Sequence, residues 1–165
     1  MKQPPFGYVI EYVPHLKKNW YVINEEECEA LEDIFESITF SHSLASIAED
    51  LNKSGFQTRS EKRFSALSVR AIVKDPFYIN LIRTKKGGET AYEFSAHPCP
   101  IRTEEWVFAQ VMINNIDVLK EPQIQQQLRN PHYEPCNSFF EIVGEEDNTD
   151  YYLDLYDEEP EGPLV

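Results

Sequence analysis

A dense group of positively charged side chains lies between residues 53 and 86. This stretch contains nine basic residues against two acidic ones, a local charge of +7, whereas the whole chain carries a formal net charge of −14. Lysine and arginine at this density can neutralise a row of phosphates, because each cation that pairs with a phosphate releases a bound counterion. The stretch therefore predicts a polyanion site, most simply for the phosphates of DNA.

The centre of this stretch is expected to be a short helix that begins after Ser65 and stops at Asp75-Pro76. Helical spacing places Val69, Ile72 and Val73 on its buried face. The opposite, open face then carries four side chains: Leu67, Arg70, Ala71 and Lys74.

We expect two kinds of contact between this region and DNA. Arg70 and Lys74 are expected to enter a major groove, with Ser68 or Leu67 touching base edges. Six further cations are expected to bind phosphates, which position a protein rather than specify a sequence: Arg59, Lys62, Arg63, Arg83, Lys85 and Lys86. The competing interpretation is a basic face that only water contacts.

Other candidate chemistry in the sequence has simpler explanations. His97-Pro98-Cys99 has no second Cys or His at ligand spacing, so a loop histidine beside a buried cysteine is expected rather than a metal site. Four serines have cap or surface explanations and no paired base in a recognisable arrangement: Ser41, Ser43, Ser65 and Ser68. We therefore expect no enzyme activity, no metal and no cofactor.

Two helices are expected before the third one. Asn24 and Glu27 suit a capping box at the start of the first helix. Ser43 can cap the second helix, and Gly55 is well placed to end it. Two helices, a basic connection and a third helix together predict a helix-turn-helix core.

Two pairs of β-prone segments flank this core. The first pair, 6–13 and 20–23, predicts a hairpin. The second pair, 77–84 and 91–95, predicts another hairpin because Gly87-Gly88 lies in the turn between them. The expected fold class is therefore α+β, with a winged-helix-like core, flanking β-hairpins and an acidic C-terminal tail.

Composition divides the chain into three parts. Residues 1–117 are expected to form the DNA-binding domain, which ends in a helix over about 104–117 that Thr103 caps. Residues 118–137 contain three prolines and a glutamine run, and are expected to be a linker. Residues 138–165 are expected to be an acidic tail, extended or folded as a β-hairpin.

The acidic tail has three interpretations. Residues 134–165 contain eleven acidic residues and no lysine or arginine, so most of the negative charge of the chain lies there. The tail could remain solvated, could fold back onto the basic face and compete with DNA, or could bind another protein with acids that imitate phosphate spacing. The sequence leaves these three open.

Composition also excludes several classes of protein. No apolar run approaches the roughly 18 residues that cross a bilayer, and the first residues contain no secretory signal. The three cysteines, Cys28, Cys99 and Cys136, are widely separated, which argues against a disulfide framework and suggests a reducing compartment. We therefore expect a cytoplasmic protein that has no membrane partner.

Several short motifs follow one another in a specific order over residues 4–106. They include Pro5-Phe6-Gly7-Tyr8, Ile34-Phe35, Ser43-Leu44, Leu51-Asn52, Thr58-Arg59, Ser68-Val69-Arg70, Asp75-Pro76, His97-Pro98 and Glu105-Trp106. In this order and spacing the chain resembles the recombinase domain, a DNA-binding domain of large serine site-specific recombinases. The resemblance implies that the chain binds double-stranded DNA.

The chain departs from the usual organisation of that family. The family carries an N-terminal catalytic domain of the resolvase type, and Pro4 lies so near the first residue that we expect this domain to be absent. The family usually continues into a cysteine-rich zinc ribbon, but the sequence has no Cys-x-x-Cys pair, so a ribbon is not expected either. Phe64 stands where the family has a tryptophan before the third helix.

These observations give one leading prediction and one alternative. The leading prediction is a non-catalytic DNA-binding protein that acts in or regulates site-specific DNA recombination. Its expected partners are double-stranded DNA and, through the acidic tail, a separately encoded recombinase subunit or another protein. The alternative is an acidic interaction protein or DNA mimic that binds a nucleic-acid enzyme or recombinase.

Overall fold

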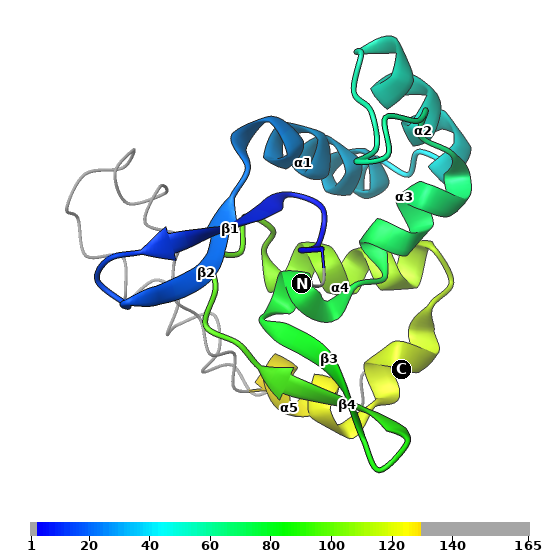
Figure 1. Cartoon of the computed structure of the whole chain (residues 1–165). Helices are drawn as coiled ribbons and strands as arrows, with labels where there is room; N and C mark the ends of the chain where they lie inside the picture. The colour runs from blue at the N-terminus through cyan, green and yellow to red at the C-terminus, as the bar shows by residue number, and fades with distance from the viewer. Residues whose placement is uncertain (1–2, 130–165) are drawn as a thin grey trace, which may run out of the picture. The chain divides into compact units, whose positions relative to one another are not determined.

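Residues 3–129 of the chain are described by a computed structural model (Figure 1). Within them lie five α-helices, two antiparallel β-hairpins and two short 3-10 helices. In chain order the elements are β1 (Tyr8–Val13), β2 (Lys18–Ile23), α1 (Glu25–Thr39), α2 (Leu44–Lys53), α3 (Ala66–Val73), η1 (Pro76–Ile79), β3 (Leu81–Lys86), β4 (Glu89–Phe94), α4 (Thr103–Met112), η2 (Ile116–Lys120) and α5 (Pro122–Arg129). The predicted α+β class is therefore confirmed. The predicted tail, residues 138–165, lies outside the described residues.

The first three helices begin at the caps that the sequence predicts. The side chains of Asn24, Ser43 and Ser65 each accept a hydrogen bond from the backbone amide three residues later, at 3.1 to 3.2 Å. Each bond satisfies one of the amides that the first turn of a helix leaves without a partner. The side chain of Glu27 does not close a capping box around Asn24, because it accepts from other donors described below.

Both predicted hairpins are present, but the second begins later than expected. Gly87 and Gly88 form its turn, both with positive φ, which suits the twist of a two-residue hairpin loop. Residues 77–79 belong to η1 instead of a strand. Asp75 caps this short helix by accepting from the amide of Phe77 at 3.0 Å, and Pro76 has a φ that suits a first helical turn. Residues 77–79 are therefore apolar because every residue of η1 is buried, and not because they form a strand.

The structure also differs from the sequence prediction after residue 112. The helix expected over 104–117 ends at Met112, where Ile113 is its C-cap and Asn114 has a φ of 58°. Residues 118–129 of the predicted linker are helical, in η2 and α5, because Pro122 occupies a position where a helix can start. Ile124 is fully buried, so α5 packs on the domain instead of leading away from it. Residues 130–137 of that linker are outside the described residues.

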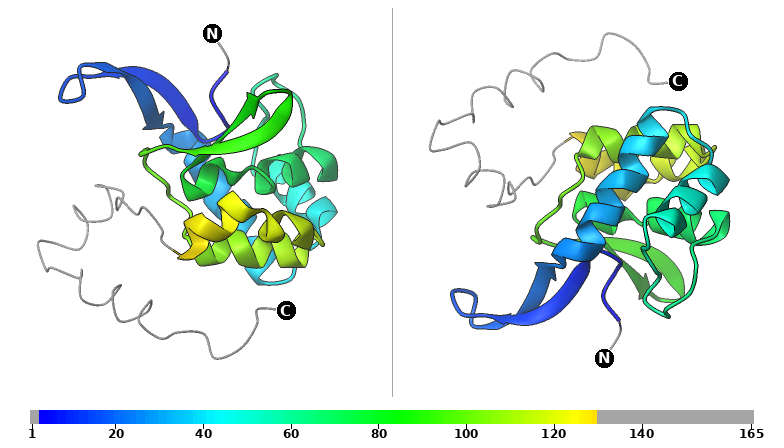
Figure 2. Two further views of the ribbon diagram at one scale, coloured as in Figure 1. Left: turned by 90° about the horizontal axis from the view of Figure 1, so that it is seen from below. Right: turned by 90° about the horizontal axis from the view of Figure 1, so that it is seen from above.

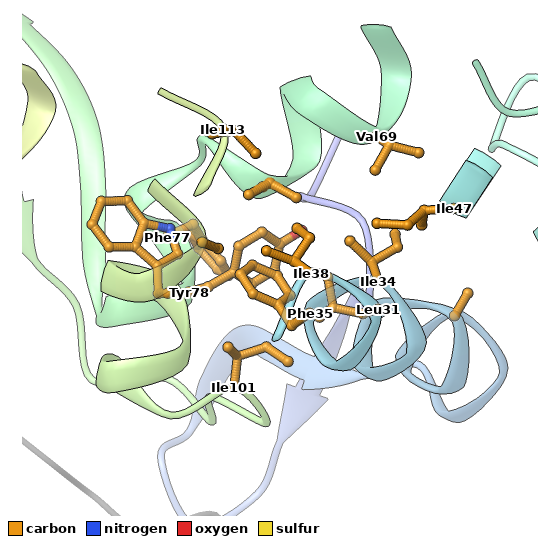
Figure 3. Close-up of a cluster of buried hydrophobic side chains, with 14 of the residues drawn as sticks. Leu31, Ile34, Phe35, Ile38, Ile47, Val69, Phe77, Tyr78, Ile101 and Ile113 are labelled. Atoms are coloured by element: carbon orange, nitrogen blue, oxygen red, sulfur yellow. The ribbon is translucent and has the colours of Figure 1, made fainter. Parts of the chain in front are cut away.

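The buried side chains form a core between the helices (Figure 3). Leu31, Ile34, Phe35 and Ile38 of α1 point towards side chains from α2, α3 and η1. Burial of apolar surface on this scale is the main favourable contribution to folding. The β1–β2 hairpin is anchored to the core by Tyr8, which is fully buried, and its far end extends away from the helices in Figure 1.

His97 is a buried polar member of this core. Its ring stacks on Phe77 with 3.7 Å between ring centroids, and only 2% of the residue is exposed. Its Nε2 lies 2.7 Å from the carbonyl of Phe77, and its Nδ1 lies 3.0 Å from the hydroxyl of Ser95. Because a carbonyl only accepts, Nε2 carries the proton and Nδ1 of the neutral ring accepts from Ser95. The expected loop histidine is thus a structural side chain.

We expect protonation of His97 to destabilise the domain. Burial lowers the pKa of His97 from 6.5 to about 4, so the unfolded chain takes up this proton at a higher pH than the native one. Stability from the neutral ring is therefore present above about pH 6.5 and is lost as the pH falls towards 4, with about 2 kcal/mol lost between about pH 7 and 5. Urea unfolding of the wild type and of His97→Gln at these two pH values measures this difference. An equal pH dependence in both proteins would contradict the assignment.

Candidate nucleic-acid interface

Helix α3 has the predicted orientation at Val69, Val73, Leu67 and Lys74. Val69 and Val73 are fully buried, whereas Leu67 is 79% exposed and Lys74 is exposed. In Figure 1 the helix lies between α2 and α4, and it contacts both of them. One face of α3 therefore belongs to the core and the other is open to a partner.

Side chains of α4 hydrogen-bond to main-chain carbonyls at the C-terminal end of α3. Gln110 donates to the carbonyl of Val73 at 2.8 Å, and the indole of Trp106 donates to the carbonyl of Asp75 at 3.0 Å. In return, Arg70 of α3 donates to the carbonyl of Ile113, at the end of α4, at 2.7 Å. Each helix thus supplies partners to carbonyls that the C-terminal turn of the other leaves unsatisfied.

Two residues that were expected to touch bases have internal roles. Arg70 is half-buried, because its guanidinium caps α4, so it is not on the open face as predicted. The hydroxyl of Ser68 donates to the carbonyl of Ser65 at 2.9 Å and accepts from the amide of Ser65 at 2.8 Å. The bond from the amide of Ser65 is half of the capping box of α3, whose other half is the bond from the amide of Ser68 to the hydroxyl of Ser65, so a base contact by Ser68 would compete with this cap.

The α2–α3 connection (residues 54–65) is held at its end by a side-chain clamp. The amide of Asn52 donates to the carbonyl of Phe64 at 3.0 Å, and its oxygen accepts from the amide of Phe64 at 2.7 Å. Phe64 is buried and packs edge-on against Phe6. Lys62 and Arg63, which come just before this anchor, are exposed. The connection therefore presents two cations next to the start of α3.

Arg59, which the sequence predicts to bind phosphate, has internal partners in the structure. Its guanidinium pairs with the carboxylate of Glu27, at 2.8 Å from Nε to Oε1 and 2.5 Å from Nη2 to Oε2. It also donates to the backbone carbonyls of Pro4 and Tyr8. Only 18% of the Arg59 side chain is exposed. A planar, forked guanidinium suits such a set of internal acceptors, which a count of charges along the sequence cannot detect.

The β3–β4 hairpin presents further cations. Arg83 and Lys85 are exposed and, being two residues apart in β3, lie on the same face of the hairpin. Lys86 pairs with Glu93 across the two strands at 2.7 Å, an exposed contact that contributes little to stability but lowers the free positive charge. In Figure 2 the tip of this hairpin and the α2–α3 connection extend in the same direction from the helices, whereas Figure 1 shows them at opposite ends of the domain.

Five of the ten predicted contact residues are thus exposed cations for which the described part of the chain supplies no acidic partner. They are Lys62, Arg63, Lys74, Arg83 and Lys85. We call them the unpaired cations. They come from the α2–α3 connection, the end of α3 and β3, and η1 lies between the last two. Leu67, on α3 between Arg63 and Lys74 in the sequence, is an exposed apolar side chain.

A family model described as Recombinase matches residues 25–116, which is more than half of the chain. The chain belongs to the Recombinase family. This membership confirms the resemblance inferred from the sequence motifs and relates the chain to site-specific recombination. No curated protein and no solved structure matches it.

The Recombinase match covers the helices and the hairpin that carry the unpaired cations. It begins at α1 and ends at the start of η2, so β1, β2 and α5 lie outside the matched residues. The Arg59 contacts cross this limit, because Glu27 and Arg59 lie inside it whereas Pro4 and Tyr8 lie before it. The N-terminal segment (residues 4–8) is therefore tied to the Recombinase domain by Glu27 and Arg59, in addition to Tyr78, which donates to the carbonyl of Phe6 at 2.7 Å.

Sequence reasoning missed the residues that position this interface. Asn52, Glu27, Gln110 and Trp106 each act on a residue between 12 and 37 positions away. No local spacing rule connects such pairs, so only the fold identifies them. In residues 3–129, no group of three or more His, Cys, Asp or Glu side chains gathers as a metal site, and no helix is long and apolar enough to cross a membrane.

Proposed function

We propose that this Recombinase-family chain is a non-catalytic DNA-binding protein that acts in or regulates site-specific recombination. The observation that supports this proposal is the set of unpaired cations on the α2–α3 connection, at the end of α3 and on β3. Cations without internal partners are available to phosphates, and such contacts supply most of the sequence-independent affinity for DNA.

The proposed binding mode is that of a winged helix. Three helices, α1 to α3, are followed by the β3–β4 hairpin, which is the order that such a fold uses. In this mode α3 would enter a major groove with Leu67 and Lys74 towards the bases. Lys62 and Arg63 on one side, and Arg83 and Lys85 on the hairpin, would bind phosphates and fix the register of the helix.

The proposed absence of catalysis is supported by the roles of the serines. Ser43, Ser65 and Ser68 all take part in helix caps in the described structure. In the described part of the chain their hydroxyl groups hydrogen-bond to backbone groups and to each other, and not to a histidine or carboxylate that could remove a proton. The proposed partner is therefore duplex DNA, with any recombination chemistry supplied by a separate recombinase subunit.

The second candidate is an acidic interaction protein or DNA mimic, and one observation favours it. Helix α1 has six exposed acids: Glu25, Glu26, Glu29, Glu32, Asp33 and Glu36. Partial burial raises the pKa of Glu32, and the neighbouring charges of Asp33, Glu105 and Glu29 raise it further. Such a surface would bind a basic partner. A wild-type chain that does not bind duplex DNA would favour this candidate.

We expect Lys74→Gln to weaken binding to duplex DNA and to reduce its salt dependence. One lost phosphate contact lowers the slope of log affinity against log salt by about 0.9. Fluorescence anisotropy with the full chain and a labelled duplex measures both quantities. The matched control is Lys53→Gln on α2, since Lys53 is equally charged but pairs with Glu49 at 3.0 Å. Equal slopes for the wild type and Lys74→Gln would contradict the role of Lys74.

A further inference from the structure

The ion pair between Arg59 and Glu27 joins three separate parts of the domain. Glu27 lies in the first turn of α1, and Arg59 lies in the α2–α3 connection. The carboxylate of Glu27 also accepts from the amide of Gly7 at 2.8 Å, and Arg59 donates to the carbonyls of Pro4 and Tyr8. Three backbone groups of the N-terminal segment are thus bonded to one pair of side chains.

The pair is shielded from water, which makes it sensitive to the loss of either partner. The side chains of Arg59 and Glu27 are only 18% and 19% exposed. Removing one charge from such a pair leaves the other charge poorly solvated and without its partner. Either substitution should therefore release the connection from α1 and loosen the N-terminal segment, which Tyr78 still holds through the carbonyl of Phe6.

Arg59 is part of a small turn that leads directly to two unpaired cations. The amide of Thr58 donates to the carbonyl of Lys62 at 2.9 Å, and the amide of Glu61 donates to the carbonyl of Thr58 at 2.8 Å. Phe64 fixes the far end of the connection through the Asn52 clamp. The position of Arg59 at one end and of Phe64 at the other therefore sets where Lys62 and Arg63 lie.

We propose that Arg59 and Glu27 are positioning residues that couple the N-terminal segment to the phosphate contacts of Lys62 and Arg63. This inference rests on the proposed function, because it concerns the same DNA interface. A change that displaces residues 4–8 would then also reduce the order of Lys62 and Arg63 in the α2–α3 connection. Cations that are already ordered lose less side-chain freedom when they bind, so the coupling raises affinity.

Glu27 gives the proposal a test in which charge and position have opposite effects. Simple electrostatics predicts that Glu27→Gln strengthens DNA binding, since a negative charge is removed from the domain. The positioning role predicts weaker binding, because a neutral amide no longer compensates the charge of Arg59 and the connection is released. The control is Glu26→Gln. Glu26 directly precedes Glu27 in the first turn of α1 and its side chain is exposed, so this substitution removes the same charge without breaking the ion pair.

We expect Glu27→Gln to weaken binding of the full chain to a duplex by about tenfold, as two cations lose their order. Glu26→Gln should bind as tightly as the wild type or slightly more tightly. Two variants that both bind at least as tightly as the wild type would overturn the proposal. If Glu27→Gln does not fold by circular dichroism, Arg59→Lys replaces it. That variant keeps the net charge, but a single ammonium cannot reach all of the acceptors of Arg59.

Hydrogen exchange of the free protein tests the coupling without DNA. Glu27→Gln is expected to speed exchange of the amides over residues 57–63 as well as that of Gly7, whereas Glu26→Gln leaves them unchanged. Unchanged exchange over residues 57–63 in Glu27→Gln would overturn the coupling. If the exchange differences between the variants are as expected but the wild-type chain binds no duplex, the coupling stands and the proposed function is overturned.

Discussion

Replacing all five unpaired cations by glutamine is expected to remove nearly all salt-dependent binding to duplex DNA. If each of the five neutralises one phosphate, log affinity of the wild type should fall against log salt with a slope of about −4.5. Between about 50 and 200 mM salt this slope corresponds to a loss of roughly 500-fold in affinity. The variant should show a slope near zero, because Lys62, Arg63, Lys74, Arg83 and Lys85 are the exposed cations of the predicted site that have no acidic partner in the described structure.

The control for this variant carries the same change in net charge elsewhere. Five exposed cations on other elements serve for it: Lys17, Lys18, Lys53, Arg102 and Lys120. Three of them, Lys53, Arg102 and Lys120, form ion pairs with acids three or four residues away. Salt titrations of both variants by fluorescence anisotropy decide between a site and a general charge effect. Equal losses of slope in the two variants would mean that the five positions have no special role.

Trp106→Ala is expected to destabilise the domain by about 3–5 kcal/mol, a large part of the stability of a typical domain. Trp106 is the largest fully buried side chain of the described residues, and its indole donates to the carbonyl of Asp75. The substitution therefore opens a cavity and leaves a carbonyl near the end of α3 without its partner. Urea unfolding followed by circular dichroism measures the free energy of unfolding of both proteins.

Phe108→Ala on the same helix is the matched control for Trp106→Ala. Phe108 is also a large aromatic residue, but it is 42% exposed and lies outside the buried core. Its removal should cost less than about 1 kcal/mol, because little apolar surface is lost from the interior. Similar losses for the two variants would show that burial in α4 does not determine stability.

The helix starts could be predicted because the physics that sets them is local. Asn24, Ser43 and Ser65 each act on an amide three residues later, so one sequence contains both partners at a fixed spacing. The predicted linker was wrong over residues 118–129 for a related reason. Pro122 starts a helix as readily as it ends one, and only the burial of Ile124 distinguishes the two cases.

The site could be predicted only in part, because charge along the sequence does not report on partners. Arg59 and Lys62 are alike in a count of cations, yet one is bonded to Glu27, 32 residues away, and the other is exposed. Arg70 likewise faces a carbonyl 43 residues further on. The Thr58-Arg59 motif that supports the family resemblance therefore includes a residue that serves the fold, and only the tertiary structure separates such residues from those available to DNA.

In the proposed binding mode, the bonds from α4 to α3 have a consequence for how a preference for a DNA target can change. Gln110 and Trp106 reach carbonyl oxygens of the main chain, and every residue type carries such an oxygen. New side chains at positions 67, 71 and 74 would therefore leave these attachments intact. The attachment of α3 does not depend on the side chains of its open face, so in the proposed binding mode natural variation or laboratory selection can change these three residues without changing how the helix is held.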